Sequence, residues 1–338
     1  MAGADAPTLA VASPRALLVI GIVSTEKRKE WRDRLRTVYK PWVDRGVVIL
    51  KFVLDSRRLP DNALDELGVP ISKTRYRYFQ TACAHKMVAF WQQAGRWPAQ
   101  YYVKTDDDAA LNLHHIVPLV QSLPRKRLYS GILRYSSMND TTLEGVCWAA
   151  GPNGALNKKR TARECKGPTV SGPYPFAEGP FILISSDVQQ WVSTRLRRDA
   201  RQQCHFEDLL LGRALSQHPR LRIVNLGALL SDPNIVSNRG VWLGTNGPLA
   251  HWTRTAALLS RTVKSFELAV NASPPRVFPR PPCAPWRDSY PRLHQFSCCT
   301  NWTLCDGKET NKYWKGLRAV YQASGRAASI GTESNTLT

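Results

Sequence analysis

Short apolar runs alternate with segments of helical periodicity along the first part of the chain. The runs at 16–24 and 47–55 are almost continuously apolar, as expected of strands buried on both faces. The segments 26–36 and 81–95 place their apolar residues at helical spacing instead. Strands that alternate with helices predict a parallel sheet with right-handed crossovers. We therefore expect an α/β fold.

Capping residues and later apolar runs extend this pattern. Ser24 and Thr25 offer N-cap chemistry for the first helix, and Gly95 closes the second. The later expected elements are a strand at 181–185, helices at 187–198 and 206–215, and a strand at 222–226. From residue 271 the chain is irregular and rich in proline and cysteine. We expect a flexible N-terminus over 1–14, one α/β domain over 15–270, and a Cys/Pro-rich extension over 271–338 with a disordered end.

A third apolar run, at 101–103, is followed by three consecutive carboxylates, Asp106, Asp107 and Asp108. Ligands bind at the carboxyl ends of the strands in open α/β sheets. Adjacent acids raise each other's pKa unless a cation neutralises them, and their hard oxygens suit Mg²⁺ or Mn²⁺. These cations usually also coordinate phosphate oxygens. A solvated acidic turn is the alternative, which only the neighbouring sequence disfavours.

The charge of the chain favours the binding of anions. Its 338 residues carry a formal net charge of +21 and a pI near 10.0, which favours nucleotide diphosphates and other polyanions as ligands. The basic stretches at 26–36 and 195–201 are interrupted by acids and apolar residues, as on a solvated helix face. No nucleic-acid-binding signature accompanies them. We therefore expect no nucleic-acid partner.

Cysteines and glycosylation triplets indicate an oxidising compartment. None of the eight cysteines forms a CxxC pair, which argues against a structural zinc site, and four of them crowd into 283–305. Asn139, Asn271 and Asn301 each begin an N-glycosylation triplet. The first residues lack signal-peptide character, and the apolar run Ala16 to Val23 is too short to span a bilayer, which takes ~20 residues. We expect a lumenal protein whose membrane anchor is not visible in this chain.

Four blocks resemble the inverting β1,3-glycosyltransferases of family 31, in the family's order and spacing. They are LLVIGIVSTEKRKEWRDRLRTVY, KMVAFWQQAGRWPAQYYVKTDDDAALN, YPFAEGPFILISSDV and FEDLLLGRAL. The resemblance covers roughly residues 16–255. Tyr39 stands where the family usually has Trp, and Phe176 and Phe181 stand where Tyr is commoner.

The resemblance implies a GT-A type, Rossmann-like catalytic domain with a mostly parallel central sheet, and it implies roles for individual residues. Asp208, the second acid of the Glu-Asp block, would be the general base. Asp106, Asp108 and His251 would hold the metal, although a lone His near Trp is as often structural. Residues expected to bind the donor are Thr25, Arg32, Arg36, Lys104, Asp106, Asp107 and Glu207. The acceptor side would include Glu178, Gly179 and Pro180, with Trp148, Trp242 and Trp252 as candidate stacking platforms.

The expected activity is an inverting transfer of galactose or N-acetylglucosamine from UDP-galactose or UDP-N-acetylglucosamine. Mn²⁺ or another divalent cation would be the cofactor, and the acceptor would be a glycan, glycoprotein or glycolipid, linked β1,3, in the Golgi lumen. One general base beside a leaving-group cation differs from the paired carboxylates of glycoside hydrolases, which favours transfer over hydrolysis. Three alternatives stay open: a non-catalytic carbohydrate-binding relative, a polyanion-binding protein, and another metal-dependent phosphoryl-transfer enzyme. Glu207 and Asp208 could also simply favour a helix N-terminus.

Overall fold

The fold is known from a computed structural model. It describes residues 16–55, 64–70, 79–149, 169–197, 207–226, 249–250 and 297–298. The expected flexible N-terminus, nearly all of the C-terminal extension, and three of the expected site residues lie outside this part of the chain: His251, Trp242 and Trp252.

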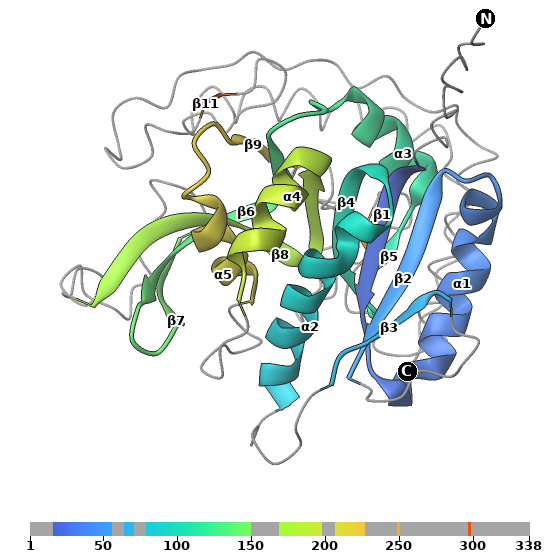
Figure 1. The fold of residues 1–338 in the computed structure, drawn as a ribbon, viewed down its shortest axis with the longest axis horizontal. Helices are drawn as coiled ribbons and strands as arrows, with labels where there is room; N and C mark the ends of the chain where they lie inside the picture. Colours follow the sequence, from blue (N-terminus) through green and yellow to red (C-terminus); the bar gives the residue numbers. More distant parts are fainter. Residues whose placement is uncertain are drawn as a thin grey trace, which may run out of the picture.

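Helices and strands alternate through the first half of the described chain (Figure 1). The strands are β1 (Ala16–Val23), β2 (Val48–Leu54), β3 (Glu66–Gly68), β4 (Ala99–Asp106), β5 (Ala110–Leu111), β6 (Leu128–Asn139), β7 (Glu144–Ala149), β8 (Val170–Ser185), β9 (Arg222–Asn225), β10 (Leu249–Ala250) and β11 (Ser297–Cys298). The helices are η1 (Glu26–Arg28), α1 (Lys29–Asp44), α2 (Phe79–Gln93), η2 (Ala94–Arg96), α3 (Leu113–Ser122), α4 (Ser186–Arg195) and α5 (Glu207–Leu215). The expected strands and helices are thus present, with shifted ends.

The central sheet is mostly parallel, as expected, in an arrangement compatible with a Rossmann-like fold. Within the described residues its order is β11-β9-β6-β8-β4-β1-β2-β3, with β7 paired to β6 at one side. The pairs of β1 with β2 and with β4 are parallel. β8 lies between β4 and β6 and is antiparallel to both. The expected strand at 181–185 is therefore only the end of a longer strand that runs against the parallel set.

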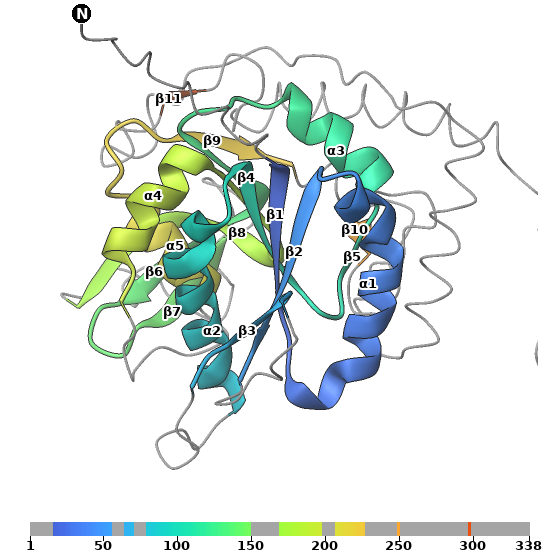
Figure 2. The same ribbon diagram turned by 45° about the vertical axis from the view of Figure 1, so that its right-hand side comes forward.

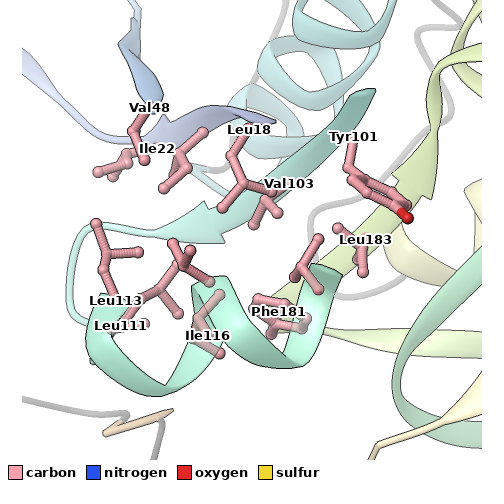
Figure 3. Close-up of a cluster of buried hydrophobic side chains, with 14 of the residues drawn as sticks. Leu18, Ile22, Val48, Tyr101, Val103, Leu111, Leu113, Ile116, Phe181 and Leu183 are labelled. Carbon is pink, nitrogen blue, oxygen red and sulfur yellow. The ribbon is translucent and has the colours of Figure 1, made fainter. Parts of the chain in front are cut away.

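Helices cover both faces of the sheet (Figure 2). One face packs against α1 and α3, where Tyr39 and Ile116 are fully buried with Leu18 and Val103 of the strands. Figure 3 shows side chains of α3 packed on this face of the sheet. The other face packs against α2, α4 and α5, which contribute Met87, Phe90, Val188 and Leu211 among others. The sheet is thus the middle layer of three, and its strand ends remain at the rims.

Two local expectations are corrected by the structure. The helix at 81–95 is not amphipathic with a wet side: residues 84–91 of α2 are all buried, because the sheet covers one side and α4 the other, where Gln189 donates to Trp91 O at 2.8 Å. The Ser24-Thr25 pair does not cap the first helix through its side chains. Thr25 makes no side-chain capping bond, and Ser24 Oγ donates to Asp107 Oδ2 at 2.7 Å instead.

Candidate functional site

The predicted acidic residues meet where the carboxyl end of β4 approaches the middle of β8 and the start of α5. Lys104 pairs with Ile182 across the β4–β8 ladder, so the end of β4 lies beside Gly179 and Pro180. Thr105 Oγ1 donates to Pro180 O at 2.6 Å. The helix α5 packs tightly on β8 because Gly212 has no side chain: a Cβ there would lie 2.4 Å from Pro175 O. This packing brings Glu207 and Asp208 to the strand ends.

Lys104 is the centre of this cluster and is completely buried. Its Nζ donates to Asp106 Oδ1 at 2.8 Å, to Gly179 O at 3.3 Å and to Glu207 Oε1. Burial acts to lower the pKa of Lys104, but the charges of Asp106, Glu207 and Asp208 outweigh it and raise the pKa above its ordinary value. The ammonium therefore stays charged and holds two acids of different elements together. We call Lys104, Asp106, Glu207 and Asp208 the Lys104 cluster.

Asp208 has a distinct environment within this cluster. Its Oδ2 accepts a hydrogen bond from Gly179 N at 2.8 Å. Burial and then the negative charge of Glu207 raise the pKa of Asp208 to about 7. A carboxylate with such a pKa can take up a proton near neutral pH, which is the property of a general base.

Gly179 is the point where the acids come closest to the backbone. A Cβ at this position would lie 3.1 Å from both Asp106 Oδ2 and Lys104 Nζ, and 3.8 Å from Asp208 Oδ2. Distances of 3.1 Å are tighter than ordinary van der Waals contact, so a side chain here would push the charged groups apart. The glycine thus lets β8 run directly beside the Lys104 cluster.

Asp107 belongs to a second network, on the side of β1. Its Oδ2 accepts from Ser24 Oγ at 2.7 Å, its Oδ1 pairs with Arg28, and its N–H donates to Val23 O at 3.2 Å. Burial raises the pKa of Asp107, although the bonds from Ser24 and Arg28 oppose the rise. Arg28, on η1, could not be predicted as a partner, because nothing in the pattern of residues 26–36 distinguishes it from the other arginines.

Asp106 and Asp108 are the described residues that could hold a divalent cation. Burial, followed by the charges of Asp106 and Asp107, raises the pKa of Asp108 to about 6, and a bound cation would relieve that repulsion. Within the described ranges, no group of three or more His, Cys, Asp or Glu residues is arranged to hold a metal ion. Two carboxylates still fit Mg²⁺ or Mn²⁺, which usually take their remaining ligands from water and substrate phosphates. Their donor chemistry therefore fits the expected cofactor, with His251 outside the described residues.

Arg32 and Arg36 lie in a separate network between α1, β2 and β3. Arg36 pairs with Asp65 at 2.6 Å, Glu66 at 2.7 Å and Asp33 at 2.7 Å, and its guanidinium lies 4.8 Å from the centre of the Phe52 ring. Arg32 pairs with Glu66 at 3.1 Å and donates to Thr25 O. We call Arg32, Arg36, Asp33, Asp65 and Glu66 the arginine network. The structure does not join these two arginines or Thr25 to the Lys104 cluster by any contact it describes.

No helix in the described ranges is long and apolar enough to cross a membrane. Cys83, on α2, is part of a disulfide. Disulfides form and persist mainly in oxidising compartments.

Contacts join the four sequence blocks in a chain through their own residues. Ser24 and Arg28 of the first block bind Asp107 of the second, Lys104 of the second binds Gly179 O of the third, and Gly179 N binds Asp208 of the fourth. A scan against models of known protein families finds no match for this chain, and a search of curated proteins finds no relative. The site is therefore interpreted from its residues and their geometry.

Proposed function

We propose that the protein is a UDP-sugar-dependent hexosyltransferase of GT-A type. It would transfer galactose or N-acetylglucosamine with inversion to a hydroxyl of a glycan, glycoprotein or glycolipid, through a β1,3 linkage. The observation that carries the proposal is the chain of contacts that joins all four sequence blocks, from Ser24 to Asp107, from Lys104 to Gly179, and from Gly179 to Asp208. An accidental resemblance would not require residues so far apart in sequence to meet.

Asp208 is the base in this proposal. Its carboxylate accepts the proton of the acceptor hydroxyl while that oxygen attacks the anomeric carbon, and the bond to the diphosphate breaks with its electrons going to the leaving UDP. The hydrogen bond from Gly179 N at 2.8 Å fixes the orientation of Oδ2. The pKa near 7 makes the carboxylate basic enough to accept a proton at neutral pH.

The other acids have supporting roles. Lys104 holds Glu207 and Asp106 in place, so the role proposed for Glu207 is to anchor this buried ion pair and not to act as the general acid of a hydrolase. Asp106 and Asp108 would hold Mn²⁺ or a similar cation, which supplies positive charge for the leaving diphosphate. The Cys83 disulfide supports placement of the enzyme in the lumen of the secretory pathway, with the Golgi as the proposed site.

A donor screen tests the proposal. UDP release is measured with Mn²⁺ across UDP-sugars, with and without a mixture of glycan acceptors, and the expected result is acceptor-dependent release from UDP-galactose or UDP-N-acetylglucosamine. Chelation by EDTA should remove it. UDP binding without any turnover would indicate a non-catalytic relative, and absence of UDP binding would overturn the proposal.

A further inference from the structure

Within the described ranges, two charged side chains beyond the Lys104 cluster have fewer hydrogen-bond partners than they could take. Asp55 directly follows β2, and Lys86 lies on α2. Oδ1 of Asp55 is buried and has no hydrogen-bond partner in the part of the chain that the structure describes. Lys86 is 1% exposed, and its one hydrogen bond among the described residues goes to Ser24 O at 2.6 Å. An ammonium has three donors, so two have no acceptor among the described residues.

Asp55 and Lys86 lie on the same face of the sheet. Successive strand residues point to opposite faces, and Val53, two residues before Asp55, packs with α2 in the core of that face. Lys86 extends from α2 to the end of β1 at Ser24, whose N–H donates to Val53 O at 3.0 Å. Burial lowers the pKa of Lys86, and among the acids that oppose this Asp55 acts most strongly.

Asp55 and Lys86 nevertheless form no ion pair with each other in the described structure. A buried carboxylate oxygen without a hydrogen-bond partner and a buried ammonium with a single acceptor among the described residues both destabilise the fold. Asp55 follows β2, Lys86 reaches Ser24 after the neighbouring strand β1, and the charge of Asp55 acts on Lys86, so a ligand at these two strand ends could complete both groups. In open α/β sheets this is also where ligands bind.

The opposite charges of the two side chains restrict what the ligand can be. A phosphate would be repelled by Asp55, and a metal ion would be repelled by Lys86. A neutral group that presents a donor to the carboxylate beside an acceptor for the ammonium satisfies both. A nucleoside carries two such edges: the imide of uracil, with an N–H between two carbonyls, and the diol of ribose.

We propose that Asp55 and Lys86 form the nucleoside subsite of the donor nucleotide. The carboxylate of Asp55 accepts a hydrogen bond from the donor–acceptor edge of the nucleoside, and Lys86 donates one to it. This inference rests on the proposed function, because it assumes a nucleotide donor. Ser24 links the subsite to the acids: its carbonyl binds Lys86 and its hydroxyl binds Asp107, next to Asp106. The nucleoside would thus lie at β1 and β2, with the diphosphate toward the end of β4.

Calorimetric titration of the full chain with UDP, CDP and 2′-deoxy-UDP in Mn²⁺ tests this subsite. Asp55→Asn should bind UDP about tenfold or more weakly, the scale of losing one hydrogen bond to a charged group. If the imide is the edge, the wild type prefers UDP to CDP, which lacks the N–H, and Asp55→Asn loses that preference. If the ribose is the edge, the wild type prefers UDP to 2′-deoxy-UDP, and the variant loses that preference instead. Asp44→Asn, on the exposed end of α1, is the matched control.

Lys86→Met provides a second, independent variant that keeps the length of the side chain. It should weaken UDP binding to a similar degree while leaving the affinity for inorganic pyrophosphate unchanged. An equal loss for pyrophosphate would overturn the nucleoside assignment, as would wild-type UDP affinity with both preferences intact in Asp55→Asn. A wild-type protein that binds no UDP would instead overturn the proposed function, and this inference with it.

Discussion

The Lys104 cluster and the arginine network are both dense groups of charges, but they contain acids whose pKa values are shifted in opposite directions. In the Lys104 cluster the one cation is fully buried among Asp106, Glu207 and Asp208, and the pKa of Asp208 is raised to about 7. In the arginine network Arg36 is 29% exposed and has three acidic partners. There, hydrogen bonds from Lys29 and Arg36 lower the pKa of Asp33.

The folded protein therefore favours the ionised form of Asp33 and disfavours the ionised form of Asp208. A lowered pKa means that the folded protein favours the ionised acid, so ionised Asp33 contributes stability. A raised pKa means that ionisation opposes folding. Groups held in this way concentrate at functional sites. The arginine network thus connects α1 to β3. The Lys104 cluster instead contains an acid whose ionisation is disfavoured, at the place where catalysis is proposed.

The largest expected effect concerns Asp208 and the rate of transfer. Asp208→Asn keeps the shape of the side chain and removes its basicity, so kcat should fall by ~100-fold or more, with little change in UDP affinity. The measurement is steady-state transfer together with calorimetric UDP binding. Glu207→Gln should reduce kcat less and lower the thermal midpoint more, because it weakens the buried pair with Lys104. An exchange of these two phenotypes would make Glu207 the base.

The second effect concerns stability at Lys104. Lys104→Met leaves the buried Glu207 and the partly exposed Asp106 without their cation, and loss of one partner of a buried ion pair costs about 3–5 kcal/mol. Denaturant unfolding of the variant measures this loss. A fall of under 1 kcal/mol in the free energy of unfolding would mean that Glu207 and Asp106 find other partners and that Lys104 is not needed to balance their charges.

The third effect sharpens the role of Asp108. Asp108→Asn should lose most of the Mn²⁺-dependent increase in UDP affinity, measured by titration with and without EDTA. Its folded pKa of about 6 lies above the ordinary value of 3.8, so its ionisation removes stability as the pH rises from about 4 to 6. Without metal the variant should therefore be as stable as the wild type at pH 4 and slightly more stable at pH 7. A variant that is less stable at pH 7 would contradict the repulsion inferred at this site.

The amino-acid pattern predicted the layers of the fold better than the direction of its strands. Apolar runs identified β1, β2 and β4, because buried parallel strands are apolar throughout. The short run at 181–185 carries no information on the direction of its strand. β8 is antiparallel to β4 and β6, and this pairing is decided by how the whole sheet assembles. The β6–β7 pair was missed, since its polar and apolar residues follow no period that distinguishes it from a loop.

The candidate site shows the same limit at the level of side chains. The acids at 106–108 and 207–208 could be predicted, because clustered carboxylates at strand and helix ends are visible in the sequence. The partners of Arg32 and Arg36 could not, because Asp65 and Glu66 come near α1 only when β3 joins the edge of the sheet. Asp55 and Lys86 gave no signal, since unused hydrogen-bonding capacity exists only in three dimensions.

The smallest expected effect is at Arg36 and measures how much the arginine network contributes to the free energy of unfolding. Arg36→Met keeps the aliphatic stem that packs near Phe52 and removes the charge. Partly exposed ion pairs contribute about 0–1 kcal/mol each, so the free energy of unfolding should fall by about 1 kcal/mol. Because solvent screens these charges, the loss should shrink in high salt, whereas the loss from Lys104→Met should persist. Transfer activity should stay at the wild-type level, since no described contact joins Arg36 to the Lys104 cluster. A large fall in UDP affinity would instead return Arg36 to the donor-binding role that its sequence block predicts.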